Sequence, residues 1–103
     1  EAFDGVPRDT FIKALAAEGV GVGVGAHGAP IYQNPVFQEG RIKHPRNGEP
    51  LDYSGVHCPE AERLFATQAM SMRHAMFLGE KEDIDLILDA IRKIRENTDE
   101  LKG

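Results

Sequence analysis

The chain has little cysteine and no long apolar run. Cys58 is its single cysteine, so no disulfide can form within the chain, which fits a reducing cytoplasm. No segment approaches the roughly 20 consecutive apolar residues that a membrane-spanning helix needs. The start of the chain also lacks the pattern of a secretory leader. We therefore predict a cytoplasmic protein without a membrane partner.

An excess of positive charge is lacking as well. The chain carries 12 lysines and arginines against 17 aspartates and glutamates, which gives a net charge of −5 at pH 7. A nucleic-acid platform needs a basic face, and so does a surface that attaches to anionic lipids. We therefore expect no nucleic-acid partner. The 41% of hydrophobic and 28% of charged residues are typical of a globular protein, and 103 residues suit one domain.

Three segments have apolar residues at the three- and four-residue steps of an amphipathic helix. The first is predicted over residues 7–18, between a proline that suits a helix start and Gly19, which suits a helix end. A second begins at Cys58. The third begins near Gly79 and runs to about Asn97, with acids at its start and bases toward its end, as the helix dipole favours. We expect the tail after it to fray. Its apolar stripe comprises Ile84, Ile87, Leu88, Ile91 and Ile94.

Valine and glycine alternate over residues 20–24, which predicts a strand with every valine on one face. The glycines leave the other face bare, so either another backbone or a ligand approaches there, or the strand is weak. Short strands are also expected near residues 38–43 and over 69–72, around an irregular stretch from 25 to 55. The expected fold is therefore α+β, a small sheet of short strands packed on one face by about three helices. The expected core places Ile84, Ile87 and Ile91 over Val20, Val22 and Val24.

Several motifs allow both a functional and a structural interpretation. The pattern G-x-G-x-x-G over residues 23–28 matches a dinucleotide fingerprint, but prolines follow where its helix should start, which favours a glycine-rich turn. Cys58 follows a histidine, yet sequence neighbours rarely face each other as nucleophile and base, so we expect it to cap a helix or to pack. The basic cluster is either a solvated loop or a contact for an anionic ligand, and it comprises Arg41, Lys43, His44 and Arg46.

The histidines stand at positions 27, 44, 57 and 74, without the close H-x-x-x-H spacing of a zinc motif. We therefore assign no metal site. His74 differs from the others because it lies between Met72 and Met76, just before the last helix. There it would be half-buried or would face a ligand. The methionines around it, together with Met70, are interpreted as core residues.

Three segments together carry a likeness to a known family. RDTFIKALAAEGV at residues 8–20 looks like a helix leading into a strand. APIYQNPVF at 29–37 is similar to a loop of the pattern P-L-(H/Y)…P-(L/Y)-(F/Y). A closing block combines CPEAER at 58–63, RHAMFLG at 73–79, EDID at 82–85 and AIRKI at 90–94. In this order and spacing, across nearly the whole chain, they resemble the C-terminal domain of the sugar aminotransferase family often called DegT–DnrJ–StrS.

The resemblance implies a pyridoxal-phosphate-dependent enzyme of fold type I, usually a homodimer. Such an enzyme moves an amino group from glutamate or glutamine to a keto sugar, often nucleotide-linked, or to a cyclitol ketone. The cofactor does the carbanion chemistry, and the protein orients and tunes it. In the family, the lysine that binds the cofactor and the acid facing its pyridine nitrogen belong to a large domain.

Residues 1–103 have no counterpart to that large domain, so we assign no catalytic or cofactor-binding residue to them. The lysines lie in none of the right contexts, and they are Lys13, Lys43, Lys81, Lys93 and Lys102. We expect residues 1–103 to be a single C-terminal small domain that neither catalyses nor binds the cofactor by itself. The start at Glu1, without an initiator methionine, fits a fragment of a longer protein.

The resemblance also implies that two segments approach the substrate pocket. The loop after the first strand maps to His27 and Tyr32, and the segment before the last helix maps to His74. We therefore predict His27, Tyr32 and His74 as substrate-binding residues, with Arg41 and Lys43 as weaker candidates. The sequence departs from the family over residues 20–28, which are richer in glycine than the usual strand.

Two alternatives remain open from the sequence. A free-standing module that binds a small ligand or regulates another protein would have a native start close to Glu1 and would fold as 103 residues. A small metal-binding protein would retain metal after purification.

Overall fold

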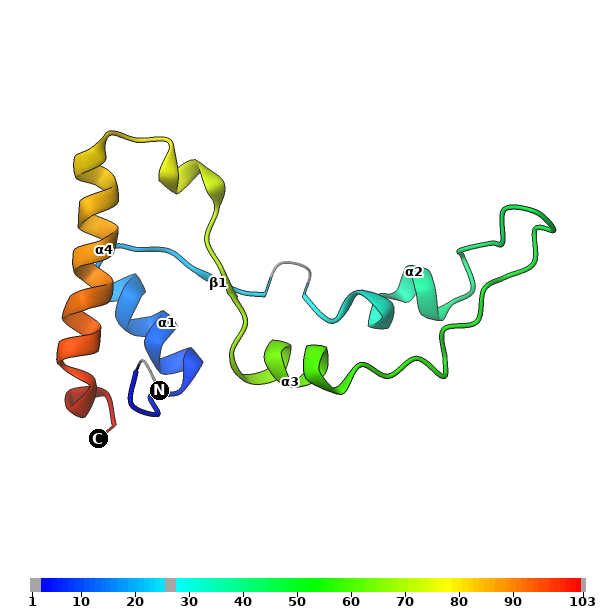
Figure 1. Ribbon diagram of the computed structural model, residues 1–103, viewed down its shortest axis with the longest axis horizontal. Coiled ribbons are helices and arrows are strands. Elements are labelled where there is room, and N and C mark those ends of the chain that lie inside the picture. Colours follow the sequence, from blue (N-terminus) through cyan, green and yellow to red (C-terminus); the bar gives the residue numbers. More distant parts are fainter. Residues whose placement is uncertain (1–2, 26–27, 103) are drawn as a thin grey trace.

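The computed structural model describes residues 3–25 and 28–102 and divides into two regions (Figure 1). We call residues 3–25 and 69–102 the body, and residues 28–68 the arm. The radius of gyration is 18.5 Å, whereas a compact domain of about 100 residues has roughly 13 Å. The principal extents of 55 × 34 × 18 Å also show an elongated molecule. Both values are large because the arm projects from the body instead of folding back on it.

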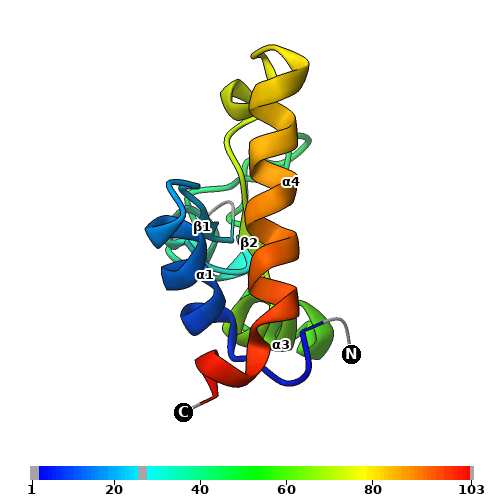
Figure 2. The same ribbon diagram turned by 90° about the vertical axis from the view of Figure 1, so that its left-hand side faces the viewer.

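The body is built on two helices, α1 (Arg8–Ala17) and α4 (Lys81–Glu96), which lie side by side in both views (Figures 1 and 2). The helix predicted over residues 7–18 is confirmed. It stops where Gly19 takes a positive φ of 85° and the amide of Val20 donates to the carbonyl of Leu15 over 2.8 Å. Glycine adopts this left-handed conformation without strain, which is why it ends helices so often.

The start of α4 is fixed by its own side chains. Glu80 and Asp83 form a reciprocal capping box, each side chain accepting from the other residue's amide, which satisfies two amides without helix partners. After α4, the short 3₁₀ helix η3 (Thr98–Leu101) replaces the frayed tail expected from the sequence. That expectation is wrong because Leu101 packs against the core and Lys102 forms an ion pair with Asp4.

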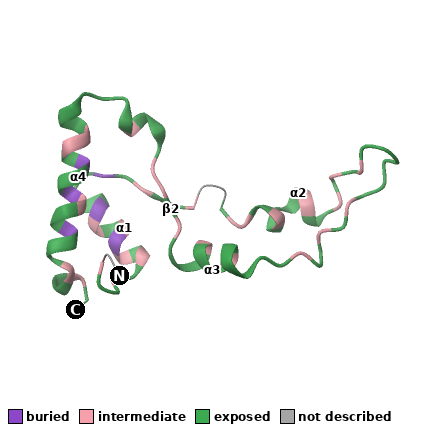
Figure 3. Cartoon of the chain, in the orientation of Figure 1, coloured by how far each residue is buried: buried purple, intermediate pink, exposed green. Residues whose placement is uncertain are grey.

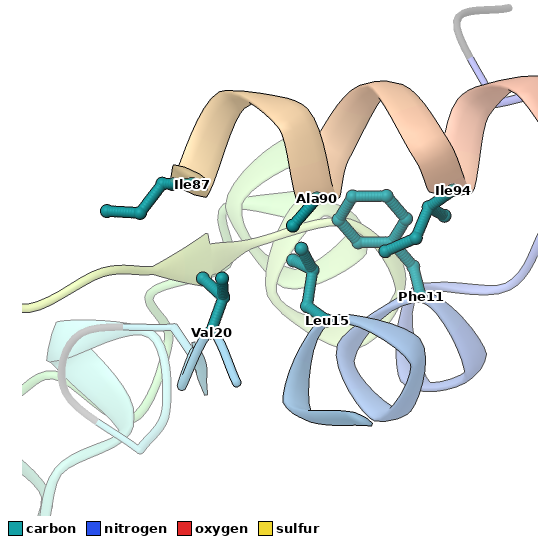
Figure 4. Close-up of a cluster of buried hydrophobic side chains, with 6 residues drawn as sticks. All are labelled: Phe11, Leu15, Val20, Ile87, Ala90 and Ile94. Carbon is teal, nitrogen blue, oxygen red and sulfur yellow. The ribbon is translucent and has the colours of Figure 1, made fainter. Parts of the chain in front are cut away.

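The core lies between α1, α4 and the segment that follows α1 (Figure 4). The buried side chains are Phe11, Leu15, Val20, Ile87, Ala90 and Ile94. The helical spacing of the first two and of the last three places each set on one face of its helix, so the two faces close on each other. The predicted stripe of α4 is confirmed at Ile87 and Ile94, while Leu88 is 41% exposed. The core is therefore a contact between helices more than a helix cover on a sheet.

The sheet is smaller than the sequence indicated. Its antiparallel strands are β1 (Gly23–Val24) and β2 (Met70–Ser71), with Gly23 opposite Ser71 and Val24 opposite Met70. The strand predicted over 20–24 is wrong in length and in its single valine face, because Val20 enters the core while Val24 is 41% exposed. The α+β class is confirmed, although only two residues of each strand find partners.

The arm consists of two chain branches that run out from β1 and back to β2 (Figure 1). The outgoing branch contains the 3₁₀ helix η1 (Ile31–Gln33) and the short helix α2 (Pro35–Gln38), and the returning branch contains α3 (Pro59–Thr67). None of its residues 28–68 is buried, so every buried residue in Figure 3 lies in the body. The ring of Phe37 meets that of Tyr53 edge-on, with 5.2 Å between the ring centroids.

The strand expected near residues 38–43 is not formed. Asn34 accepts from the amide of Val36 over 3.1 Å, and Pro35 follows it at the first helical position, so the helix α2 forms over residues 35–38 and overlaps the expected strand at Gln38. Extended pairing in this part of the arm is limited to an isolated bridge between Lys43 and Pro50. Across residues 3–25 and 28–102, no helix has the length and apolar character needed to cross a membrane.

Candidate functional site

Next to the sheet, two hydrogen bonds close the end of the body, and another crosses from the body to α3 in the arm. The amide of Gly25 donates to the carbonyl of Ala69 over 3.2 Å, and the hydroxyl of Ser71 donates to the carbonyl of Gly25 over 2.7 Å. The guanidinium of Arg8, on α1, donates to the carbonyl of Phe65, on α3. These bonds set the direction in which α3 leaves the body.

Gly25 is also the place where a side chain approaches a bare glycine. It has a φ of +59°, and a Cβ atom added there would lie 2.7 Å from the ring of Phe65. Only glycine combines this backbone conformation with such a close neighbour.

For the glycines within residues 20–24, the sequence predicted an approaching backbone or ligand, or else a weak strand. The weak strand is what forms, because β1 has two residues, and an added Cβ would meet nothing within 4 Å at Gly21 and Oγ of Ser71 at 3.6 Å at Gly23.

Beyond Gly25, the base of the arm contains an open groove of about 390 Å³, which we call the arm groove. Most of its lining is apolar and comes from both branches, including Ala29, Pro30, Ile31, Ala61, Leu64 and Phe65. Tyr32 and Cys58 also line it. Ligand sites are typically apolar concavities with a few fixed polar groups, and the arm groove has such a group at Tyr32.

Tyr32 belongs to a small polar cluster between the branches. Its hydroxyl donates to Oε1 of Glu62 on α3, and the amide of Cys58 donates to the hydroxyl over 3.3 Å. Partial desolvation of the phenol raises the pKa of Tyr32, with a further contribution from the bond to Glu62. The same bond is the main cause that lowers the pKa of the Glu62 carboxyl. The phenol is therefore held neutral beside an ionised carboxylate.

Of the three predicted substrate-binding residues, Tyr32 and His74 lie in the described part of the chain, and no interaction recorded there brings these two together. Tyr32 lies in the arm groove. His74 lies in the body, on the 3₁₀ helix η2 (His74–Phe77) before α4, and is exposed instead of half-buried. His27 falls outside the described residues. Of the methionines around His74, Met72 and Met76 pack against the core as predicted, whereas Met70 is 40% exposed.

The basic cluster lies on the far part of the arm, between α2 and α3. Arg41 pairs with Glu39, and the amide of Arg46 donates to Nδ1 of His44 over 3.3 Å. Lys43 is exposed. The cluster lies outside the lining of the arm groove, so Arg41 and Lys43 do not join Tyr32 in one site.

Cys58 precedes α3 as its N-cap residue, as predicted, but without a side-chain capping bond. Its thiol is free and exposed, and Nδ1 of the neighbouring His57 lies 3.9 Å from Glu62 instead. Among residues 3–25 and 28–102, no group of three His, Cys, Asp or Glu side chains could hold a metal ion. The G-x-G-x-x-G pattern leads into the short helix η1, not into the long helix that a dinucleotide site needs.

Sequence reasoning missed Glu62. Its importance comes from Tyr32, which lies 30 residues away in the sequence, and no local pattern signals such a pairing. The one hint was the position of Glu62 in the first turn of α3, where its carboxylate can turn back toward the amide of Cys58 at 3.4 Å.

Comparison with known proteins shows similarity to aminotransferases, in agreement with the three sequence segments. The chain is 33% identical over 106 residues to a Micromonospora echinospora protein assigned as an L-glutamine:3-amino-2,3-dideoxy-scyllo-inosose aminotransferase, covering 99% of this chain and 25% of that protein. It is 30% identical over 104 residues to a protein of the same assignment from Streptomyces kanamyceticus, covering 97% and 25%. It is 29% identical over 107 residues to a Streptoalloteichus tenebrarius L-glutamine:2-deoxy-scyllo-inosose aminotransferase, covering 100% and 25%.

No family model and no solved structure matches the chain. The chain spans about a quarter of the length of the curated relatives, and it matches the C-terminal part of a sugar aminotransferase. The resemblance stated from the sequence is thereby confirmed.

Proposed function

We propose that this chain is the C-terminal small domain of a cytoplasmic, homodimeric, pyridoxal-phosphate-dependent aminotransferase. The whole enzyme transfers an amino group from glutamine or glutamate to a cyclitol ketone or a keto sugar, including nucleotide-linked ones. The observation that carries this proposal is the similarity over 97% or more of this chain to aminotransferases named for glutamine and scyllo-inosose. Because this chain covers a quarter of the length of such enzymes, it corresponds to a supporting domain, and the large domain accounts for the remaining length.

The residues of this chain do not fit the cofactor. When bound, pyridoxal phosphate supplies the electron sink for carbanion chemistry, and it needs a lysine in a desolvated pocket. Lys81, Lys93 and Lys102 form surface ion pairs, with side chains 80%, 63% and 35% exposed. Lys13 and Lys43 are exposed, and the arm groove is lined by no lysine. The cofactor site is therefore assigned to the large domain.

Within this chain, we propose Tyr32, His74 and His27 as contacts of the amino acceptor. Tyr32 has the strongest support because it lines the arm groove. His74 is supported by its exposure on η2 and by its place between the sheet and α4. His27 rests on the sequence resemblance alone.

The test uses the full-length polypeptide with L-glutamine and a cyclitol ketone. We expect transamination, and a rise of about tenfold in the KM for the ketone in Tyr32→Leu and His74→Ala, as a lost contact of about 1.4 kcal/mol gives. The Kd for the cofactor should change less than this KM. Arg92→Ala is the matched control, because Arg92 pairs with Asp89 on the exposed side of α4.

An unchanged KM in both variants would refute the assignment of these contacts. Absence of transamination with the unsubstituted protein and every ketone tested would refute the enzyme itself, and would favour a binding or regulatory module.

A further inference from the structure

The hydroxyl of Tyr32 has all its hydrogen-bonding positions occupied by residues of the arm. It donates to Oε1 of Glu62, and it accepts from the Cys58 amide at 3.3 Å and from Nε2 of Gln33 at 3.4 Å. A phenol has one proton to donate and two lone pairs to accept with. Its hydrogen-bonding capacity is thus used by the protein, and none of it is free to donate to a ligand.

Glu62 holds this arrangement from the opposite branch. Its Oε1 accepts from the amide of Cys58 over 3.4 Å as well as from Tyr32, so one carboxylate oxygen connects η1 with the start of α3. Bonds to an ionised acceptor are stronger than those between neutral groups. Because none of residues 28–68 is buried, packing contributes little to the relative position of the two branches. This connection is one of the few interactions that fix it.

The ring is the part of Tyr32 that remains available. Tyr32 lines the arm groove together with apolar neighbours from both branches, among them Pro30, Ile31 and Leu64. The ring of a cyclitol or pyranose presents apolar C–H faces between its polar hydroxyls. An aromatic face in an apolar groove complements such a C–H face.

We propose that Glu62 is the positioning residue for Tyr32: by holding the hydroxyl, it turns the aromatic ring toward the C–H face of the amino acceptor. The inference rests on the function proposed above. It assigns the contact to the ring and not to the hydroxyl, and it gives Glu62 a role through Tyr32.

Four variants of the full-length polypeptide and one control variant separate these roles. Glu62→Gln keeps an amide oxygen where Oε1 now accepts, so the KM for the ketone should stay within about twofold of the unsubstituted value. Glu62→Leu removes the acceptor and should raise that KM about five- to tenfold, the range for a lost hydrogen bond. Tyr32→Phe should raise it less than Tyr32→Leu, which lacks the ring. Glu60→Leu is the matched control, because Glu60 lies on α3 but pairs with Arg63 at 2.8 Å.

A double-mutant cycle and hydrogen exchange give readouts that a general loss of stability would not imitate. Glu62→Leu in the Tyr32→Leu background should add little to KM, because the positioned ring is already gone. The Cys58 amide should exchange faster in Glu62→Leu and stay protected in Glu62→Gln.

An active enzyme in which Glu62→Gln raises KM as much as Glu62→Leu, or in which the two changes add fully, would overturn the positioning role. A KM in Tyr32→Phe equal to that in Tyr32→Leu would overturn the role of the ring. Inactivity of the unsubstituted protein would instead overturn the proposed function and this inference with it. It would be seen before any variant is made, so the two failures are distinguishable.

Discussion

The body and the arm contain similar apolar side chains but hold them in different ways. In the body, six hydrophobic residues are buried together, and the rings of Phe3 and Phe11 pack with 4.4 Å between centroids. In the arm, the described residues 28–68 include no buried one, and the branches are connected mainly by an aromatic pair and a few hydrogen bonds. Ordering each backbone residue costs about 1–2 kcal/mol. The body offsets this cost by burial, whereas the arm depends on individual contacts.

The largest expected effect that tests this difference comes from Leu15. Its side chain is 0% exposed, so Leu15→Ala should lower the free energy of unfolding by about 2–5 kcal/mol. The matched change in the arm, Leu64→Ala, removes a side chain that is 42% exposed and should cost below about 1 kcal/mol. Urea unfolding followed by circular dichroism measures both. Similar losses would show that the arm shares the core of the body.

A smaller effect is expected at the junction of the two regions. Gly25→Ala meets both a φ of +59° and the ring of Phe65, and should cost about 2–3 kcal/mol. Gly28→Ala is the control, because Gly28 has a φ of +74° while no atom of the described residues lies within 4 Å of an added Cβ; it should cost about 1 kcal/mol. Thermal unfolding of the two variants measures the difference. Equal losses would mean that the contact with Phe65 does not hold the arm.

The body was largely predictable from the sequence, because apolar residues at helical spacing indicate which face of each helix is buried. Phe11 and Leu15 on α1, and Ile87 and Ile94 on α4, recur at helical spacing and are the residues that the structure buries. Alternation was a weaker guide over residues 20–24. A strand needs partners as well as a pattern, and β2 supplies only Met70 and Ser71.

Within the arm, the sequence indicated the irregular stretch and the start of α3 but not the contacts. Glycines and prolines indicated an irregular stretch, and Pro59 indicated the start of α3. The connections that define the arm groove join residues far apart, such as Tyr32 with Glu62 and Gly25 with Phe65. No local period encodes such contacts, so the sequence pointed to Tyr32 through the family resemblance alone.

The smallest effect concerns pH, because both regions contain carboxyls whose pKa is lowered in the fold: Asp4 in the body, and Asp52 and Glu62 in the arm. In the body, the ion pair with Lys102 lowers the pKa of Asp4. In the arm, the bond from Tyr32 lowers the pKa of Glu62 below its ordinary 4.5. A carboxyl with a lowered folded pKa contributes stability above its unfolded pKa, and this contribution is lost as the pH falls through the folded value.

We therefore expect the Cys58 amide to exchange faster as the pH is lowered below about 4.5, after correction for the intrinsic exchange rate. The amides of α4 around Ile87, Ala90 and Ile94, beyond the capping box, should stay protected over the same range, because these residues are buried in the core. Glu62→Gln has no carboxyl to protonate and should remove the acid transition at Cys58, while Asp4→Asn should leave it in place. Amide exchange followed by NMR between pH 3 and pH 6 resolves the two regions. Local opening of the arm alone cannot expose the amides of α4. If α4 and Cys58 lost protection together, both in the unsubstituted protein and in Glu62→Gln, the arm and the body would therefore unfold as one cooperative unit.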